Sequence, residues 1–348
     1  MRILVTGASG FIGSFIVSRG LDLGCEMWAG LRASSSKQYL TDPAIHFAEL
    51  DLGNRERLRE QLLAYKSEMG GAWDFIIHAA GATKSLTREG FFKTNADGTR
   101  NLVNALRETD MVPHRFVFLS SLSVFGAIKE TPLPNPTAEG NTYEDITASD
   151  TPDPNTAYGE SKLAAERFLM TQPEFPWVIL RPTGVYGPRE RDYFLMAKSI
   201  KQHIDFSVGY RPQEITFVYV QDVVQAALLA CERPAADVVH RCFFLSDGKT
   251  YDSRTFSDLL QREIGTRYVF HVKAPLWFLR AVCAVNGTVC RWLGKLTTLN
   301  MDKYHILAQR NWNCDIEPAR RLLTYQPQWT LEKGVHETVK WYKQAGWL

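Results

Sequence analysis

The sequence predicts an α/β fold, with a doubly wound parallel sheet covered by helices on both faces and a smaller, mainly helical C-terminal lobe. Short continuous apolar runs alternate with helical patterns in the first half of the chain, as is typical of buried parallel strands. A glycine-rich turn follows the first run directly, and the alternation weakens after residue 181. The expected strands are residues 3–5, 26–31, 47–50, 75–79, 116–120 and 177–180.

The length of 348 residues exceeds one minimal domain, so we expect two units. We assign residues 1–183 with 216–247 to the sheet domain, and residues 184–215 with 248–348 to the second lobe. Residues 126–158 are rich in Pro, Thr, Asn and Asp, which predicts a long surface loop. A loop of that length usually has a function.

Residues 273–295 carry apolar side chains on a roughly helical period. Arg280, Asn286 and Arg291 interrupt this stretch, so we do not expect an integral membrane segment. The favoured interpretation is a core helix of the second lobe. The alternative is an exposed helix that touches a membrane or gates the substrate site. The apolar residues are Trp277, Phe278, Leu279, Val282, Val285, Val289, Trp292 and Leu293.

Composition and charge exclude some partners. Forty Lys and Arg against 38 Asp and Glu leave a formal charge of +2, too little for the basic face that nucleic acid requires. The six cysteines form no CxxC pair and no Cys/His cluster at metal-ligand spacing, so we expect reduced packing residues and no metal. The first strand begins at the amino end with no room for a signal peptide, which favours a cytoplasmic location.

The turn after the first strand has the spacing of a phosphate-binding loop. It reads TGASGFIG over residues 6–13 and is expected to open a helix. Gly7 permits the tight turn, Gly10 lets the backbone approach a pyrophosphate, and Gly13 lets helix and strand pack closely. The helix amino end offers amide groups and a partial positive charge to the phosphates. We therefore also expect Ser9, Phe11 and Ile12 at a dinucleotide.

The GxxGxxG spacing and wording resemble the extended short-chain dehydrogenase family, over about the first two thirds of the chain. Further marks are Asp51-Leu52, the His-Ala-Ala-Gly segment at 78–81, and Asn95. The resemblance implies a Rossmann sheet as the NADP-binding domain and a substrate-binding second lobe. It places Asp51 and Leu52 at the adenine and Asn95 in the helix behind the site. It places Ala79, Ala80 and Gly81 along the ribose and phosphate path.

The end of the second strand indicates which dinucleotide is used. Leu31 stands where NAD-using relatives carry an acid that bonds the adenosine 2′-hydroxyl. Arg32, Lys37 and serine hydroxyls such as that of Ser34 are available to bind a 2′-phosphate. NADP(H) is therefore favoured, with NAD as the alternative.

Tyr158 and Lys162 are one helical turn apart on one face. A phenol is a poor base at neutral pH, and we expect the nearby ammonium to stabilise its phenolate. The segment FLSSLSVFG resembles the family's strand-end serine motif, which puts the catalytic position on Ser121 rather than Ser120. The resemblance implies that Ser121 holds the substrate oxygen, that Tyr158 gives or takes the proton, and that Lys162 also bonds the nicotinamide ribose.

The segment RPTGVYGP at residues 181–188 resembles the family's stretch beneath the nicotinamide, where we expect Pro182, Thr183 and Val185. Sugar-nucleotide relatives place an asparagine where Gly184 stands and an arginine where Ile215 stands. The segment instead resembles the 3β-hydroxysteroid dehydrogenase and dihydroflavonol reductase branch, whose substrates are hydrophobic rings.

Three functions stay open at this point. The favoured one is an NADP(H)-dependent oxidoreductase that interconverts a secondary alcohol and a ketone on a largely apolar, cyclic small molecule. The first alternative is a nucleotide-sugar epimerase or dehydratase with a tightly bound dinucleotide. The second is a non-catalytic dinucleotide sensor, which has no need of Ser121, Tyr158 and Lys162. The resemblance also leaves a homodimer open.

Overall fold

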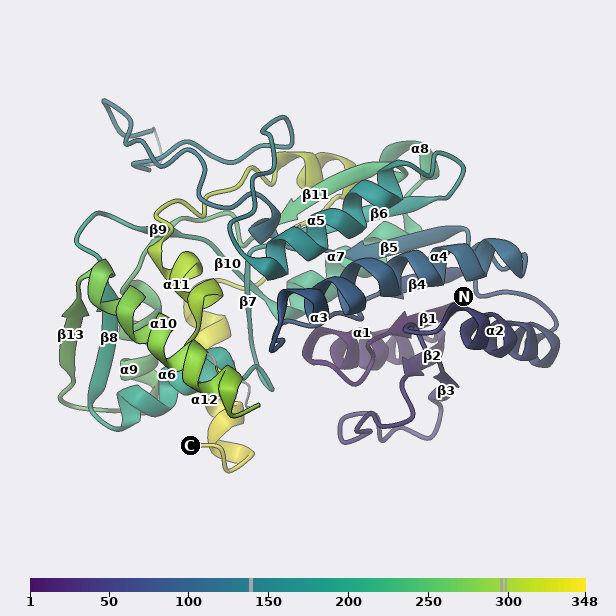
Figure 1. Ribbon diagram of the computed structural model, residues 1–348, viewed down its shortest axis with the longest axis horizontal. Coiled ribbons are helices and arrows are strands. Elements are labelled where there is room, and N and C mark those ends of the chain that lie inside the picture. The colour runs from purple at the N-terminus through teal and green to yellow at the C-terminus, as the bar shows by residue number, and fades with distance from the viewer. Residues whose placement is uncertain (138–139, 295–296, 298) are drawn as a thin grey trace.

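A parallel sheet forms the centre of the molecule (Figure 1). The computed structural model describes residues 1–137, 140–294, 297 and 299–348. Within them the sheet has seven strands in the order β11-β6-β5-β4-β1-β2-β3. The strands are β1 (Arg2–Thr6), β2 (Glu26–Leu31), β3 (His46–Glu49), β4 (Phe75–His78), β5 (Arg115–Leu119), β6 (Trp177–Pro182) and β11 (Arg241–Leu245). The six expected strands are confirmed, and β11 is a seventh that the sequence analysis did not name.

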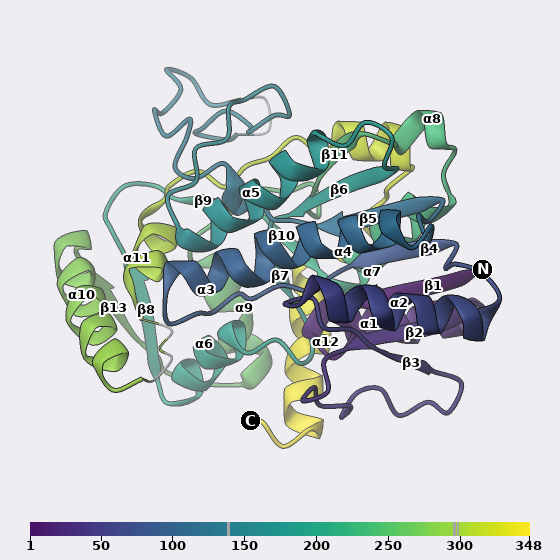
Figure 2. The same ribbon diagram turned by 45° about the vertical axis from the view of Figure 1, so that its right-hand side comes forward.

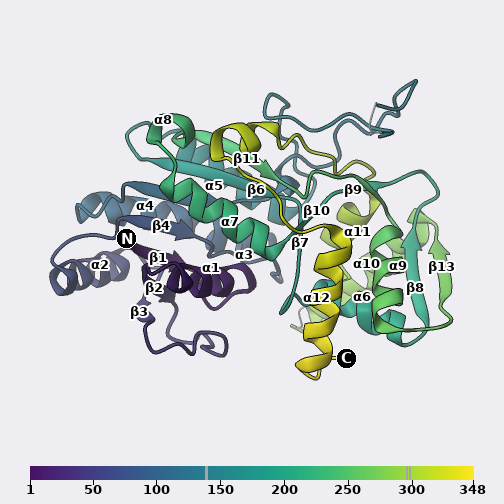
Figure 3. The same cartoon turned by 180° about the vertical axis from the view of Figure 1, so that it is seen from behind.

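Helices cover both faces of this sheet, as predicted. Figure 1 shows α2 (Arg55–Met69), α4 (Gly98–Glu108) and α5 (Ala157–Met170) on the near face. Figure 3 shows α1 (Phe11–Asp22) and α7 (Val220–Glu232) on the far face.

Alternate residues of one strand enter the two cores between sheet and helices. Ile3 and Val5 of β1 join the core beside α1, whereas Leu4 joins the core beside α2 and α4. A two-residue alternation with both faces buried produces the continuous apolar runs seen in the sequence.

Short elements complete the first part of the chain. A π-helical segment links α3 to α4, and the chain between residues 125 and 156 has one isolated bridge and no helix or strand among its described residues. That loop was expected, but it is partly packed: Tyr143 and Ile146 are buried, and the Glu214 carboxylate accepts bonds from the Thr142 and Tyr143 amides. The remaining elements here are α3 (Arg88–Phe92), η1 (Lys93–Asp97), η2 (Leu122–Val124) and α8 (Ala235–Val238).

The second lobe lies at one end of the sheet (Figure 2). Its core packs aromatic rings of Tyr186, Phe217 and Phe256 against Tyr342 and its neighbours. Among the described residues its strands form three pairs: β7 (Gly184–Tyr186) with β10 (Phe217–Tyr219), β8 (Ile204–Val208) with β13 (Phe270–Ala274), and β9 (Glu214–Ile215) with β12 (Tyr251–Asp252). Phe217 and Tyr219 of β10 join the core of this lobe, although we assigned residues 216–247 to the sheet domain. Its helices are α6 (Asp192–Lys201), α9 (Thr255–Ile264), α10 (Leu276–Trp292), α11 (Met301–Ala308) and α12 (Leu331–Gln344), whereas η3 (Ala319–Leu323) packs into the core of the central sheet.

The expectation that residues 273–295 form a core helix is wrong. Residues 276–292 do form a helix, α10, but Trp277 is 72% exposed and Trp292 is 86% exposed. Lys273 and Ala274 belong to β13, and Lys295 lies outside the described residues. Only Leu279 and Cys283 of the described α10 side chains are buried. A helical period sets which side chains share a face, but not which face the fold covers. Among the described residues, no helix has the length and apolar character to cross a membrane.

Candidate active site

The glycine loop after β1 packs tightly against the segment after β4. Gly7 has φ +68°, and a Cβ built on it lies 2.6 Å from the Ala80 Cα. A Cβ on Gly13 lies 2.3 Å from the Gly7 carbonyl oxygen, so no side chain fits there. Gly10 caps α1 without a side-chain hydrogen bond, which leaves the first helical amides for an anion.

A cleft of about 940 Å³ runs from this loop along the carboxyl ends of the strands. Such ends, where the strand order reverses between β1 and β4, are where open α/β sheets bind ligands. Its walls fit a nicotinamide dinucleotide. Gly7 and Gly10 leave room for phosphates, and the apolar side chain of Leu52 lies beside polar residues of the cleft. Expected residues that line it are Gly7, Ser9, Gly10, Arg32, Asp51, Leu52, Ala79, Ala80 and Gly81.

Other expected cofactor residues lie outside this lining. Thr183 turns toward the neighbouring strand, where its hydroxyl bonds the carbonyl and hydroxyl of Thr216 at 3.0 and 2.8 Å. Lys37 and Ser34 are exposed, and the Lys37 ammonium lies 3.9 Å from the Phe47 ring centroid. The full set outside the lining is Phe11, Ile12, Gly13, Ser34, Lys37, Asn95, Tyr158, Lys162, Pro182, Thr183 and Val185.

The sequence reasoning missed several residues that line the cleft. Thr6, Gly30 and Leu50 lie at carboxyl ends of strands, which is a signal that a strand prediction already contains. Leu31, which the sequence analysis used to choose the dinucleotide, also lines the cleft at the end of β2. The other missed residues, in loops and helix starts near the cleft, are Ser35, Gly53, Asn54, Ala82, Thr83, Lys84, Ser85, Gly90, Lys93, Thr94 and Gly98.

The fold brings Ser121, Tyr158 and Lys162 together beyond the end of β5. Ser121 directly precedes η2, and its hydroxyl donates to that of Ser123 at 3.1 Å while lying near enough to Tyr158 to influence the pKa of that phenol. Lys162 is buried, donates to the Leu119 carbonyl at 2.7 Å and lies 4.7 Å from the Phe118 ring centroid. A Cβ on Gly81 lies 3.1 Å from the Lys162 ammonium nitrogen. The three groups therefore meet where the cofactor cleft ends.

Burial governs the protonation of these groups. It raises the pKa of Tyr158 to about 12, while the hydrogen bond from Ser121 acts in the opposite direction. It lowers the pKa of Lys162 to about 8, and the carboxylate of Glu166 opposes that shift. We expected Lys162 to lower the pKa of Tyr158, but burial outweighs any such effect here. At neutral pH Tyr158 is therefore a phenol with a proton to donate.

A buried histidine that the sequence reasoning did not assign a role holds the strand ends in place. His78 Nδ1 lies 2.6 Å from the Thr6 hydroxyl, and its Nε2 lies 3.0 Å from the Thr99 hydroxyl. Burial lowers the pKa of His78 to about 3, so the ring is neutral. It links the ends of β1 and β4 to α4, and its signal in the sequence is a polar residue that ends an apolar run.

Asn95 lies behind the site, where the resemblance implied it. Its amide bonds the Ala82 backbone through both its oxygen and nitrogen, at 2.7 and 3.1 Å. The same nitrogen donates to the Ser161 hydroxyl at 2.8 Å. Asn95 therefore joins the loop after β4 to α5, the helix that carries Tyr158 and Lys162.

An ion pair lies one turn further along α5. Glu166 and Arg181 form two hydrogen bonds of 3.1 and 2.7 Å, with 0% and 4% of their side chains exposed. A bidentate pair satisfies both charged groups in a buried position. The described residues contain no group of three or more His, Cys, Asp or Glu side chains that could hold a metal ion.

Comparison with known proteins identifies this arrangement. The model of the NAD dependent epimerase/dehydratase family matches residues 3–244. The chain belongs to that family. The family supports an oxidoreductase that uses a nicotinamide dinucleotide, and residues 3–244 hold the glycine loop, Ser121, Tyr158 and Lys162.

Proteins with different functions resemble the chain over nearly its whole length. A ceramide reductase of Caulobacter vibrioides is 24% identical, covering 99% of this chain and 96% of the relative. A 3-beta-hydroxysteroid dehydrogenase of Mycolicibacterium neoaurum is 23% identical, covering 98% and 91%. The structure of a dTDP-glucose 4,6-dehydratase from Bacillus anthracis, in complex with NAD, matches with a TM-score of 0.73 at 18% identity, covering 99% and 97%. That structural likeness shows the shared fold.

A second cleft of this epimerase/dehydratase family member, about 540 Å³ in volume, lies between α5 and the second lobe. Phe91 lines it and lies 6.3 Å from the Tyr158 ring, centroid to centroid. The lobe contributes Gly287 of α10 and residues 300–302 and 305 at α11 to the opposite wall. This cleft adjoins the reactive groups and has a wall of mixed polar and apolar character.

The positions of the two missing sugar-nucleotide groups have other occupants. A Cβ on Gly184 lies 2.6 Å from the Tyr193 hydroxyl oxygen, so the phenol fills the space beside the glycine. Ile215 pairs with Tyr251 across the β9–β12 ladder.

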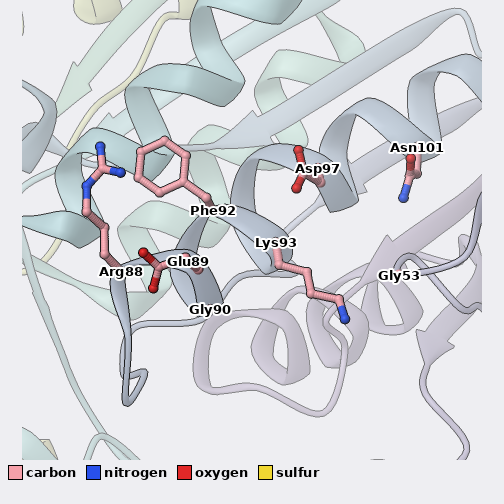
Figure 4. Close-up of a pocket in the computed structure, with 8 residues that line it drawn as sticks. All are labelled: Gly53, Arg88, Glu89, Gly90, Phe92, Lys93, Asp97 and Asn101. Carbon is pink, nitrogen blue, oxygen red and sulfur yellow. The ribbon is translucent and has the colours of Figure 1, made fainter.

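A further hollow of about 650 Å³ lies on the outer side of α3 and α4 (Figure 4). Charged side chains of Arg88, Glu89, Lys93 and Asp97 border it. It shares Gly53, Gly90 and Lys93 with the large cleft but has no part of the glycine loop, so we do not assign the dinucleotide to it.

Proposed function

We propose that the protein is an NADP(H)-dependent oxidoreductase that interconverts a secondary alcohol and a ketone on a largely apolar, cyclic substrate, steroid-like or flavonoid-like. The observation that carries the proposal is the meeting of Ser121, Tyr158 and Lys162 at the end of a cleft that fits a dinucleotide. A non-catalytic sensor has no use for this set.

The residues divide the work as follows in the direction of reduction. When bound, the dinucleotide supplies a hydride to the carbonyl carbon. Ser121 donates a hydrogen bond to the carbonyl oxygen, and Tyr158 transfers its proton to that oxygen. Lys162, fixed by the Leu119 carbonyl, places a positive charge near the phenolate that forms. Oxidation of the alcohol reverses each step.

The choice of NADP over NAD rests on the end of β2. Leu31 offers no carboxylate to repel a 2′-phosphate, and Arg32 lines the cleft beside it. Ser35 also lines the cleft, and its hydroxyl accepts a bond from the Arg32 amide at 3.1 Å. An Arg side chain with neighbouring hydroxyls is a good phosphate site.

Two observations support an apolar substrate. Tyr193 fills the space beside Gly184, so the chain lacks a side chain there to hold a diphosphate. The relatives described above include one named for a ceramide and one named for a steroid, both largely apolar. An apolar ring gains about 25 cal/mol per Å² buried, whereas an unpaired diphosphate loses its hydration with little return.

A substrate panel tests the function. We expect steroid-like or flavonoid-like ketones to oxidise NADPH, and the corresponding alcohols to reduce NADP+. Both kinds of compound should raise the melting temperature of the dinucleotide complex. UDP-glucose should do neither. Stabilisation by micromolar UDP-glucose, with no response to any apolar ring compound, would instead favour the sugar-nucleotide alternative. A dinucleotide that stays bound through purification would point the same way. No turnover of any compound by a protein that binds NADPH would favour the sensor.

A further inference from the structure

One side of the ribbon formed by β8 and β13 is polar, with Asp205 buried and with His271 and Lys273 exposed. Asp205 is buried, accepts a bond from the Ser257 hydroxyl at 3.1 Å and lies 3.1 Å from His271 Nδ1. The next residues along each strand point the other way, because side chains alternate across a ribbon. Phe206 is 62% exposed and Phe270 is 75% exposed.

Registered pairs make that outer side apolar along its length. In parallel pairing, Phe270 lies opposite Ile204, and Val272 lies opposite Phe206. Ala274 opposite Val208 completes the row. A two-stranded ribbon whose apolar side faces outward contributes little to the core of its own lobe.

Helix α10 follows β13 after a single residue and has the same inverted polarity. Its inner side includes Asn286, whose amide donates to the Thr297 hydroxyl and to the Leu299 carbonyl. Its outer side presents a row of exposed residues: Trp277, Phe278, Ala281, Ala284, Val285, Val289 and Trp292. We call this row together with the outer side of the β8–β13 ribbon the apolar platform.

The stretch of chain that forms β13 and α10 carries charge of one sign. Residues 264–301 contain five Lys and Arg residues and no Asp or Glu. Three of these cations, Arg267, Lys273 and Arg280, are described and exposed. Exposed Trp with a cationic surround is typical of helices that lie in the interface of an anionic bilayer.

We propose that the apolar platform binds the surface of a lipid bilayer that contains anionic lipids. α10 then lies in the interface with its outer row in the lipid, while Gly287 on its inner side lines the cleft that leads to Tyr158. The protein binds the membrane peripherally, and its substrate cleft opens beside the lipid. This inference goes beyond the proposed reaction and stands without it.

Co-sedimentation with vesicles tests the platform without any substrate. The full chain is mixed with sucrose-loaded vesicles of phosphatidylcholine, with or without phosphatidylglycerol. We expect binding to the vesicles with phosphatidylglycerol and weaker binding at high salt. Trp277→Gln with Trp292→Gln should weaken it at least tenfold. Lys273→Gln with Arg280→Gln should weaken it further by about fivefold per charge.

A matched control removes exposed apolar side chains elsewhere. Leu63 and Met170 are 43% and 42% exposed on α2 and at the end of α5. Leu63→Gln with Met170→Gln should leave vesicle binding unchanged, and NADPH binding by each variant checks that it is folded. The proposal is overturned if vesicle binding does not depend on phosphatidylglycerol, or if the double Trp variant binds vesicles as strongly as the wild type. A second result would also overturn it: a homodimer that does not bind vesicles and that dissociates when both Trp residues are replaced. The apolar platform would then join two copies of the chain.

Discussion

The central sheet and the β8–β13 ribbon have the same alternation of side chains, yet the sheet buries both of its faces and the ribbon leaves its apolar side exposed. In β1, Ile3, Leu4 and Val5 are all fully buried because helices lie on both faces. In the ribbon, Asp205 is buried while Phe206 is exposed. The helices of the sheet domain cover both faces of the sheet. The exposed apolar side of the ribbon and of α10 is instead suited to a partner outside the lobe.

The two regions also differ in where polar groups are used. In the sheet domain, polar side chains gather at the carboxyl ends of strands, where His78 and Lys162 are buried and hydrogen-bonded. In the second lobe, charged side chains such as Arg254 and Lys273 are exposed. We therefore expect substitutions in the sheet domain to affect folding and chemistry, and similar ones at the lobe surface to affect neither.

The largest expected difference concerns ion pairs. Arg181→Met leaves Glu166 buried without its partner and should lower the free energy of unfolding by about 3–5 kcal/mol. Arg254→Met breaks the exposed pair with Asp258 and should cost less than about 1 kcal/mol. Urea unfolding of both variants measures the contrast. Equal losses would show that the two regions do not differ in this respect.

The chemical step comes next. Tyr158→Phe should bind NADPH normally but lose about a hundredfold or more in turnover, because it removes the proton donor. Tyr268→Phe, on an exposed lobe tyrosine, is the matched control and should keep full turnover. Steady-state kinetics with the best compound of the panel provides the measurement. Near wild-type turnover by Tyr158→Phe would end the mechanism proposed here.

Two exposed arginines, Arg32 and Arg280, should differ in their effect on the affinity for NADPH. Arg32→Ala should weaken NADPH binding by about 1.5–3 kcal/mol and leave NADH nearly unchanged, since only NADPH carries the 2′-phosphate. Arg280→Ala removes an equal charge from α10 and should change neither affinity. Fluorescence titration with both dinucleotides measures these effects. Equal losses for the two dinucleotides in Arg32→Ala would contradict the NADP assignment.

The smallest effect is a dependence on pH. With a pKa of about 8, Lys162 loses its charge above that pH, and turnover should fall by up to about tenfold per pH unit. The free energy of unfolding should change in the opposite direction from turnover over the same pH range. The folded pKa lies below the unfolded one, so between about pH 8 and 10.4 the unfolded chain binds more protons and the free energy of unfolding rises with pH.

Two variants separate these pH effects. Lys162→Met should remove this rise in stability, whereas Lys273→Met, on an exposed lysine, should retain it. Thermal unfolding from pH 7 to 10 measures both. A rise of the same size in Lys162→Met and in the wild type would exclude Lys162 as its source.

Much of the first half could be predicted from the chain. Its strands appear in the sequence as apolar runs because both faces of the sheet are buried. Its phosphate-binding loop is marked by glycines because no Cβ fits at Gly7 or Gly13. The edge strand β11 was missed because its run is short and begins with exposed Arg241 and half-buried Cys242. The pKa of Tyr158 was predicted in the wrong direction, because burial depends on contacts far apart in sequence.

Six strands of the sheet, the position of the glycine loop and the one-turn spacing of Tyr158 and Lys162 could be predicted from the sequence alone, because these features depend on neighbours within a few residues. Three features became visible only in the tertiary structure. They are the outward-facing side of α10, the position of Tyr193 beside Gly184, and the link that His78 makes between two strand ends and α4. The physical reason is that periodicity defines the faces of an element, whereas the partner that covers a face comes from a distant part of the chain.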